Sequence, residues 1–426
     1  VGPAFRLISS TTWDYDHADM KELNEKIYGN DLAEKFDRYY KKSIEEDWFP
    51  DYSKNGWKMG IFAGNNGANW RATGSTWRKT AFEELETIVS LAPDMGVTSL
   101  YSDYVLPIAH HYERNDLMLQ SRVPYLQVLN EAVPPLGEAV DDWEANRRLA
   151  EAISRRAKER NIKPIQDAVD GRTVRRDYTK TLELYTMGGR VNNSKDVAQF
   201  IINASHGIPK ISFEELSQKG IVKVEGVENT MWEKDESPYH NEIVKSVRKK
   251  LPYETFTGRQ QFYIDHEWFI EFGETLPTFK EPLKIDEFPL RMMMGHARHG
   301  IHSTWRDDSF LLSLQRGEPD IYVNPDDAIN RGVEDGDMIR IYNTAGEFFA
   351  MAHVSSGIQP GMLFMYHGWD PKMFKGGKNF SEVIPTGGLI KPTSMAGDYG
   401  HLGYQPLAFA PNQTYKDFTC DFEKSA

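Results

Sequence analysis

An apolar run followed directly by a loop of small and amide residues constrains the first half of this chain most strongly. Lys58–Ala63 has the length and composition of a buried strand, and it runs into the loop Gly64-Asn65-Asn66-Gly67-Ala68-Asn69. Thr98–Pro107 alternates in a way that predicts a second strand. Between them we predict a helix near Thr80–Leu91, from apolar residues at helical spacing: Phe82, Leu85, Ile88 and Val89. This order is a βαβ unit, which predicts a parallel sheet with functional loops at its strand ends.

Two further helices are predicted from their capping residues. The longer one spans Asp141–Arg160, where Asp141 or Asp142 can cap the first turn. Its predicted inner face comprises Trp143, Leu149, Ile153 and Ala157. A shorter helix is expected after Ser212, because the sequence Ser-Phe-Glu-Glu is a capping box.

The pattern changes to short strands after residue 290. Asn324 can cap a one-turn helix that begins at Pro325. Met338–Tyr342 and Phe348–Val354 alternate as a hairpin, and Met362–Tyr366 follows a Pro-Gly turn. Several short strands at these intervals predict a closed barrel. The predicted fold class is therefore α/β, with a parallel-sheet domain like those that bind dinucleotides, followed by a C-terminal β-barrel.

The charge balance and the cysteine count exclude several classes of protein. Among 426 residues, 50 are Lys or Arg and 63 are Asp or Glu, and the net charge of −13 argues against binding of nucleic acid. The single cysteine, Cys420, excludes an internal disulfide framework and a thiolate zinc or iron–sulfur site built from this chain alone. No stretch approaches the roughly 18–20 uninterrupted apolar residues that a membrane span needs. We therefore expect a small-molecule ligand, no nucleic acid and no direct membrane span.

One group of polar residues follows the first predicted strand, and a second group surrounds the end of the second strand. The small residues of the Gly64–Asn69 loop would let backbone N–H groups approach a phosphate, and the start of a helix favours negative charge. Asp103, next to Ser102, could bind a guanine edge or a ribose hydroxyl. On pattern alone, a plain turn explains the first group equally well, and a solvated strand end explains the second better.

The densest polar cluster is Gly295–Ser303. Its three histidines, His296, His299 and His302, could ligate zinc, but the flanking glycines argue against a regular helix, and metal sites usually recruit a carboxylate or cysteine. Histidine, arginine and serine together suit an anionic or hydrogen-bond-rich ligand better. A polar surface turn without a ligand remains the alternative. Trp369, three residues after a predicted strand, is expected in the core rather than stacked on a cofactor.

In order and spacing, these motifs resemble the C-terminal part of the catalytic subunit of the dimethyl sulfoxide reductase family of molybdenum enzymes. The likeness covers about residues 57–160 and 276–426. The matching stretches are Leu100–Pro107, Tyr112-Glu113-Arg114, Asp142-Trp143-Glu144, Gly295–Ser303, Val323–Gly332, Asp335-Gly336-Asp337, Pro360-Gly361 and Tyr399–Tyr404. The subgroup that looks most similar holds nitrate, selenate and perchlorate reductases and ethylbenzene dehydrogenase. Within it, the tail from Pro385 to Tyr404 looks most like ethylbenzene dehydrogenase and related steroid side-chain hydroxylases.

The resemblance implies a molybdenum bis(molybdopterin guanine dinucleotide) cofactor and a C-terminal barrel of the double-psi, molybdopterin dinucleotide-binding type. By position, one nucleotide would be lined by Gly64, Asn65, Asn66, Ser102 and Asp103. Pterin or phosphate would be contacted by His296, Arg298, His299, His302, Ser303, His367 and Asn412. We predict no catalytic or metal-ligating residue in this stretch, and supporting roles for His110, His111 and Tyr112.

Two motifs of the family are missing from the chain, namely the Cys/His motif for a 4Fe-4S cluster and the stretch with the aspartate ligand of molybdenum. We expect both in an upstream part of a longer subunit, in agreement with a first residue, Val1, that is not an initiator. Residues 1–56 would continue an upstream domain, 57–170 form an α/β cofactor-binding segment, 171–289 an insertion and linker, and 290–426 the barrel.

The activity implied by the resemblance is oxygen-independent hydroxylation of a hydrocarbon such as ethylbenzene, with water as the oxygen source. The alternative is a terminal reductase of nitrate, selenate or perchlorate. A nucleotide-binding module without redox chemistry is the alternative from another class. The resemblance also implies an iron–sulfur electron-transfer subunit, a haem-containing subunit and a periplasmic location.

Overall fold

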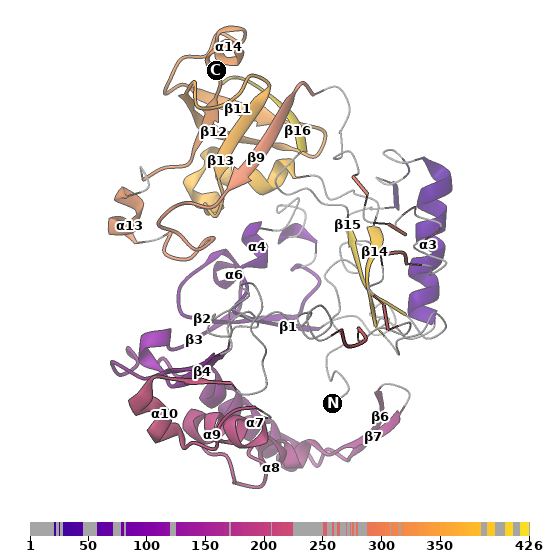
Figure 1. Ribbon diagram of the computed structural model, residues 1–426, viewed down its shortest axis with the longest axis vertical. Coiled ribbons are helices and arrows are strands. Elements are labelled where there is room, and N and C mark those ends of the chain that lie inside the picture. Colours follow the sequence, from indigo (N-terminus) through magenta and orange to yellow (C-terminus); the bar gives the residue numbers. More distant parts are fainter. Residues whose placement is uncertain are drawn as a thin grey trace. The chain divides into compact units, whose positions relative to one another are not determined.

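A computed structural model gives the fold of the chain (Figure 1). The structure describes residues 21–22, 25, 29–45, 58–70, 78–80, 82–119, 125–169, 172–205, 207–224, 250–253, 258–259, 262–264, 270, 273, 275–276, 278–279, 288–306, 308–314, 317–384, 390–396, 405–411 and 418–425. No helix in these ranges is both long and apolar enough to cross a membrane.

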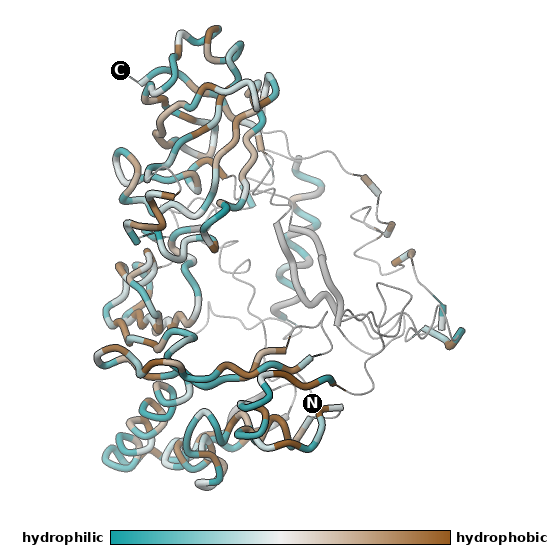
Figure 2. The backbone as a smooth tube through the Cα atoms, turned by 60° about the vertical axis from the view of Figure 1, so that its left-hand side comes forward, coloured by the Kyte–Doolittle hydropathy of each residue, from teal (hydrophilic) through white to brown (hydrophobic). Residues whose placement is uncertain are grey.

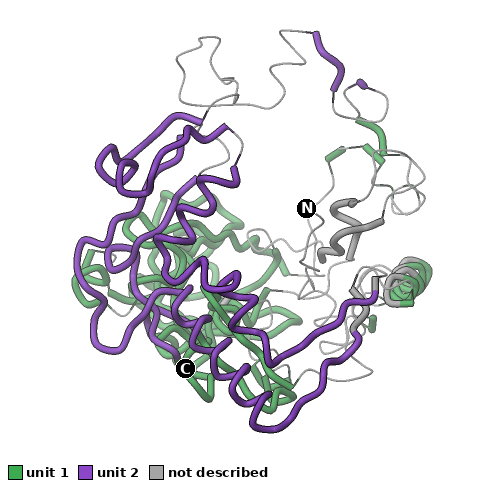
Figure 3. The backbone as a smooth tube through the Cα atoms, turned by 90° about the horizontal axis from the view of Figure 1, so that it is seen from below, with its two compact units in different colours: residues 1–90, 95–105, 260–426 green, residues 91–94, 106–259 purple. Residues whose placement is uncertain are grey.

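The chain divides into two compact units (Figure 3). Unit 1 comprises Val1–Ser90, Met95–Val105 and Gln260–Ala426, and unit 2 comprises Leu91–Asp94 and Leu106–Arg259. The domain boundaries proposed from the sequence remain predictions.

A three-stranded sheet with the strand order β1-β2-β3 carries the first predicted loop. Its elements are β1 (Met59–Ala63), α4 (Gly67–Trp70), β2 (Thr87–Ala92), α6 (Val97–Leu100) and β3 (Tyr104–Pro107). The amide of Asp103 donates to the carbonyl of Ile88 at 2.9 Å. Further along both strands, the amide of Ile108 donates to the carbonyl of Ala92 at 3.1 Å, so β2 and β3 run parallel, as predicted.

The predicted helix near Thr80–Leu91 is wrong, because β2 occupies its second half. Thr87, Ile88 and Val89 are all β-branched, and such side chains fit a sheet better than a helix. The helical spacing was misleading because Phe82 and Leu85 reach the same small core as Ile88 from a turn. The predicted strand Thr98–Pro107 begins late, at β3, since α6 occupies its start.

Six of the described strands close a barrel in the order β10-β12-β11-β16-β9-β13 (Figure 1). The elements of this region are β9 (Leu290–Gly295), α13 (Ser309–Ser313), β10 (Asp320–Val323), α14 (Pro325–Ile329), β11 (Met338–Tyr342), β12 (Glu347–Val354), β13 (Met362–Tyr366), η3 (Pro371–Met373), η4 (Lys375–Gly377), η5 (Phe380–Val383) and β16 (Phe418–Lys424). Two neighbouring pairs are parallel, namely β10 with β12 and β9 with β13. The other neighbouring pairs of the barrel are antiparallel. The predicted barrel, its hairpin and the helix capped by Asn324 are confirmed.

The barrel encloses the largest hydrophobic core of the described chain. Along its strands, side chains alternate between core and surface, and hydrophobic and hydrophilic stretches alternate along the backbone (Figure 2). Fully buried members of the core include Met292, Ile321, Ile339, Phe348 and Leu363. Cys420 lies in the same core, and burial raises the pKa of its thiol well above the ordinary range. Trp369, with an exposed fraction of 2%, belongs to this core as predicted.

The remaining described elements of unit 1 are a helix and a hairpin. They are α3 (Asn30–Glu45), β14 (Ile390–Ala396) and β15 (Gln405–Pro411). The two strands of the hairpin pair antiparallel.

Unit 2 contains the long helix that the sequence predicts, α7. Its elements are η1 (His111–Glu113), β4 (Asp116–Leu119), β5 (Tyr125–Leu129), α7 (Asp142–Glu159), β6 (Ile165–Val169), β7 (Arg172–Arg176), η2 (Tyr178–Lys180), α8 (Thr181–Tyr185), α9 (Ser194–Ala204), α10 (Phe213–Lys219) and β8 (Ile221–Lys223). The Asp141 carboxylate accepts from the amide of Glu144 at 2.7 Å and caps α7. Ser212 caps α10 in the same way through the amide of Glu215.

The inner face of α7 differs from the predicted one. Leu149 and Ile153 are 42% and 36% exposed. Ala157 is buried as predicted, and the other buried positions are Ala145, Ala150 and Ser154. Small side chains let the following segment approach closely, so the hydroxyl of Ser154 can accept from the amide of Leu182 at 2.9 Å.

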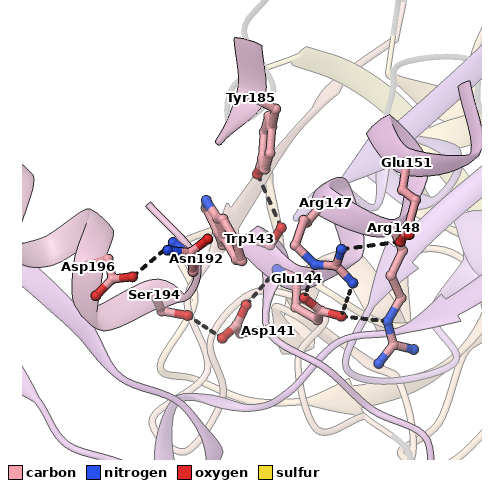
Figure 4. A network of polar contacts seen from close by, with 10 residues as sticks. All are labelled: Asp141, Trp143, Glu144, Arg147, Arg148, Glu151, Tyr185, Asn192, Ser194 and Asp196. Carbon is pink, nitrogen blue, oxygen red and sulfur yellow. Dashed lines mark hydrogen bonds and ion pairs between the residues drawn. The ribbon is translucent and has the colours of Figure 1, made fainter. Parts of the chain in front are cut away.

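Glu144 is the centre of an ion-pair network on α7 (Figure 4). Arg147 donates to both of its carboxylate oxygens, at 2.6 and 3.1 Å, and Arg148 donates to one at 2.8 Å. The hydrogen bond from Arg147, supported by that from Arg148, lowers the pKa of Glu144 from 4.5 to about 2.

We expect Glu144→Gln to lower the free energy of unfolding by about 1 kcal/mol at neutral pH, since water screens a partly exposed ion pair. Because the folded pKa lies below the unfolded one, this contribution is complete above about pH 4.5 and disappears as the pH falls toward 2. Urea unfolding of both proteins across this range measures the difference. Glu151→Gln is the control, because Glu151 accepts one bond from Arg147, at 3.2 Å, and is half exposed. A difference that stays constant with pH would contradict the prediction.

Candidate functional site

The predicted site residues that the structure describes all belong to unit 1. They lie in the loop after β1, in the turn before β3, in the segment after β9 and in the residue after β13. Asn412 lies outside the described residues, as do Tyr399–Tyr404. His110, His111 and Tyr112 belong to unit 2, and their supporting role remains a prediction.

The loop after β1 connects the sheet to the barrel through Asn66. Its side-chain oxygen accepts from the amide of Thr98 at 3.0 Å, and its Nδ2 donates to the hydroxyl of Ser303 at 2.8 Å. Asn66 and Ser303 are 237 positions apart in the chain. Two residues earlier, Gly64 has a φ of +59° and open space where a Cβ would lie, so its backbone is accessible to a ligand.

Ser102 and Asp103 take part in local structure at the start of β3. The hydroxyl of Ser102 donates to the carbonyl of Thr98 at 2.9 Å, and Oδ2 of Asp103 accepts from the amide of Ile88 at 2.7 Å. Both residues therefore help to hold α6 and β3 in place. The second carboxylate oxygen of Asp103 is the atom that could meet a ligand, because the residue is exposed.

Three imidazoles converge at one end of the barrel. β9 and β13 are parallel and in register at Gly295 and Tyr366, so the residues that follow them emerge side by side. Ring centroids lie 4.8 Å apart for His296 and His302, 4.5 Å for His296 and His367, and 5.2 Å for His302 and His367. We call these three residues the histidine cluster. Arg298 and His299 are exposed beside it.

The histidine cluster differs in membership from the trio suggested by sequence spacing. Its three ring nitrogens lie within 4.8 Å of one another and could hold a metal ion, with His367 in the place that the spacing gave to His299. Imidazoles also donate hydrogen bonds to anionic or acceptor-rich ligands. The geometry of the cluster therefore admits a metal or an anionic group.

The backbone around the histidine cluster is unusual. His302 and Trp305 have φ values of 53° and 63°, which non-glycine residues rarely adopt. Gly368 has a φ of 97°, and a Cβ on it would lie 2.0 Å from the carbonyl oxygen of His302. Strained backbone of this kind is frequent at binding sites. Sequence reasoning missed Gly368, although a glycine directly after a strand and a histidine was a signal.

A buried polar network fastens α4 to the segment after β13. Asn379, with no exposed surface, donates through Nδ2 to Oδ1 of Asn69 at 2.7 Å and to the carbonyl of Trp369 at 3.2 Å. Asn69 in turn donates to Asp370 at 3.2 Å. The bonds that Asn69 makes were not predicted, because no sequence pattern links residues 301 or 310 positions apart. They hold the loop of Asn66 against the end of the barrel that carries the histidine cluster.

Two protein families match the chain. The family described as "Molydopterin dinucleotide binding domain" matches residues 290–398, and "Molybdopterin oxidoreductase" matches residues 36–152. The first match covers the barrel strands from β9 to β13, and the second covers the sheet that carries Asn66.

Curated relatives match almost the whole chain. The respiratory nitrate reductase subunit alpha of Haloferax mediterranei is 32% identical over 99% of this chain and 44% of its own length. The dimethylsulfide dehydrogenase subunit alpha of Rhodovulum sulfidophilum is 32% identical over 96% of this chain and 44% of its own. The chlorate reductase subunit alpha of Ideonella dechloratans is 31% identical over 96% and 45%. The chain thus spans less than half the length of these relatives.

A solved structure has the same fold. The acetylene hydratase from Pelobacter acetylenicus aligns with a TM-score of 0.59 over 96% of this chain and 50% of its own, at 15% identity. Together with the two matching families and the alpha-subunit relatives, this agrees with the resemblance noted in the sequence. The chain belongs to the molybdopterin oxidoreductases of the dimethyl sulfoxide reductase family.

Proposed function

We propose that this chain is the cofactor-binding C-terminal part of a molybdenum oxidoreductase subunit. The subunit would reduce a small oxyanion such as nitrate, chlorate or perchlorate. The observation that carries the proposal is the hydrogen bond between Asn66 and Ser303, which joins the loop after β1 to the segment bearing the histidine cluster. An elongated dinucleotide needs hydrogen-bond donors from the loop after β1 and from the histidine cluster at the same time.

The donor set fits a multiply charged organic group. The histidine cluster, Arg298 and the open backbone at Gly64 offer hydrogen-bond donors and positive charge, which suit phosphate and pterin oxygens. Close to them, the indole Nε1–H of Trp369 is buried and has no acceptor among the described atoms. A buried donor without an acceptor costs free energy, and an acceptor-rich ligand at this place would relieve it.

Each predicted residue keeps its proposed role. Gly64, Asn65 and Asn66 would line one nucleotide together with Ser102 and Asp103. The residues for pterin or phosphate are His296, Arg298, His299, His302, Ser303, His367 and Asn412. When bound, the molybdenum supplies exchange of an oxygen atom with the substrate. The chain's own residues bind and orient the cofactor and exclude water around it.

The relatives favour oxyanion reduction over hydrocarbon hydroxylation. Their names are nitrate, chlorate and perchlorate reductases and a dimethylsulfide dehydrogenase, which supports the alternative prediction better than the main one. As further proposals, the enzyme would receive electrons from an iron–sulfur subunit and a haem-containing subunit, carry a 4Fe-4S cluster in its upstream part and work in the periplasm.

Metal and nucleotide analysis of the full-length protein tests the proposal. We expect two guanine nucleotides for each molybdenum after acid release, and oxidation of a reduced viologen dye by nitrate or chlorate. Asn66→Ala should lower the guanine content, whereas Asn130→Ala, an exposed asparagine in unit 2, should not. Guanine without molybdenum would favour the non-redox module. Activity with ethylbenzene and not with oxyanions would favour the hydroxylase.

A further inference from the structure

Arg306 is a buried cation beside the histidine cluster that the predicted site does not include. Its exposed fraction is 1%. Its Nη2 donates to the carbonyl of His367 at 2.8 Å, and its guanidinium carbon lies 4.1 Å from the centre of the Trp369 ring. Burial lowers the pKa of Arg306, and the nearby Asp370 carboxylate opposes this effect. Burying a guanidinium is costly, and the bond to His367 and the contact with the Trp369 ring offset part of that cost.

Arg306 joins the two segments that carry the histidine cluster. One segment, residues 301–306, contains His302, and the other, residues 366–369, contains His367. The segments touch where Gly368 packs on the carbonyl oxygen of His302. The bond from Arg306 to His367 is a second connection between them, and the rings of His302 and His367 lie stacked with an interplanar angle of 21°.

The backbone before Arg306 needs such a connection. The left-handed conformations of His302 and Trp305 are unfavourable for residues with a Cβ. Strained conformations persist only where surrounding contacts hold them. Arg306 directly follows this strained segment and is anchored on the neighbouring one.

We propose that Arg306 is a positioning residue, which fixes the backbone of His367 against the segment of His302 and thereby sets the spacing of the three imidazoles. This inference deepens the proposed function and rests on it for the identity of the ligand, the molybdenum cofactor. The competing explanation is that Arg306 only fills and stabilises the barrel. The two explanations differ in whether loss of Arg306 changes the imidazoles themselves.

A matched control exists on the same barrel. The guanidinium of Arg331 lies over the ring of Phe422 at 4.7 Å and donates to Asp421 at 2.9 Å. It shares the arginine-on-aromatic arrangement of Arg306 but contacts no residue of the histidine cluster through these bonds. Arg331→Gln therefore reports the general loss of such an arrangement.

The first measurement is imidazole ¹⁵N–¹H NMR of the 426-residue chain, with melting temperatures recorded in parallel. We expect Arg306→Gln to shift the resonances of His302 and His367, to leave His353 on β12 unshifted, and to lower the melting temperature. Arg306→Lys keeps the charge and should give smaller shifts. Arg331→Gln should lower the melting temperature without shifting His302 or His367. Unshifted cluster resonances in a destabilised Arg306→Gln chain would overturn the proposal.

The second measurement uses the full-length holoenzyme. We expect Arg306→Lys to change the Mo(V) electron paramagnetic resonance spectrum of the loaded fraction and to weaken cofactor retention about tenfold, as loss of an outer supporting contact does at metal sites. An unchanged spectrum at lower loading would count against positioning. If the wild-type protein holds neither molybdenum nor guanine, the proposed function fails, whereas the NMR result still decides the role of Arg306.

Discussion

Replacing Gly368 by alanine is expected to lower the free energy of unfolding by about 4 kcal/mol or more. The new Cβ would lie 2.0 Å from the carbonyl oxygen and 2.5 Å from the carbonyl carbon of His302, and these are backbone atoms that no rotamer change can move. The φ of 97° adds strain for any residue with a Cβ. Chemical denaturation of the variant and the wild-type chain measures the loss.

Gly376→Ala separates the clash from the backbone strain. Gly376 also has a positive φ, of 77°, but a Cβ there would meet no atom within 4 Å. We therefore expect a loss of only about 1–2 kcal/mol, the cost of a left-handed conformation. Equal losses in the two variants would mean that the segments of His302 and Gly368 are not in contact. Because Gly368 follows His367, its variant should also disturb the histidine cluster.

Breaking the buried ion pair between Arg78 and Glu382 is expected to have the second largest effect. Both side chains are only 6% exposed, and Nη2 of Arg78 lies 3.0 Å from Oε1 of Glu382. Arg78 also donates to the carbonyl of Ala68 at 2.8 Å. Glu382→Leu leaves the guanidinium buried without this partner, so we expect a loss of about 3–5 kcal/mol in urea unfolding.

The double variant tests whether the penalty comes from the uncompensated charge. Arg78→Met combined with Glu382→Leu removes both charges and should recover most of the stability lost in the single variants. As a control, Arg155→Gln breaks an ion pair with Glu159 whose side chains are 58% and 47% exposed, and should cost less than about 0.5 kcal/mol. The prediction is refuted if the double variant is as unstable as the sum of the single ones.

Local features of the fold were predictable because their causes lie within a few residues. Asp141, Ser212 and Asn324 cap helices through amides two or three positions ahead, so the residue type and its spacing are sufficient. The hairpin of β11 and β12 was predictable because one buried side forces strict alternation. The helix predicted near residue 80 failed because Phe82 and Leu85 reach their core from a turn, where helical spacing has no meaning.

The candidate site was predictable in part. The Gly64–Asn69 loop and the Gly295–Ser303 segment stood out by composition, and the family resemblance added His367. Their assembly was beyond any local pattern. His367 joins His296 because β9 and β13 are parallel and in register, whereas His299, though closer in the chain, does not join them.

Helix caps and strand alternation can be read from neighbouring residues, because those signals depend on chemistry that acts over a few residues. The family can be read from the order and spacing of motifs along the chain. The distant partners of Asn66, Asn69, Arg78 and Arg306 cannot be read in this way. They are Ser303, Asn379, Glu382 and His367, which lie 61 to 310 positions away and meet only in the folded chain. Burial then gives these contacts their strength, because a polar group shielded from water must find its partner within the folded chain.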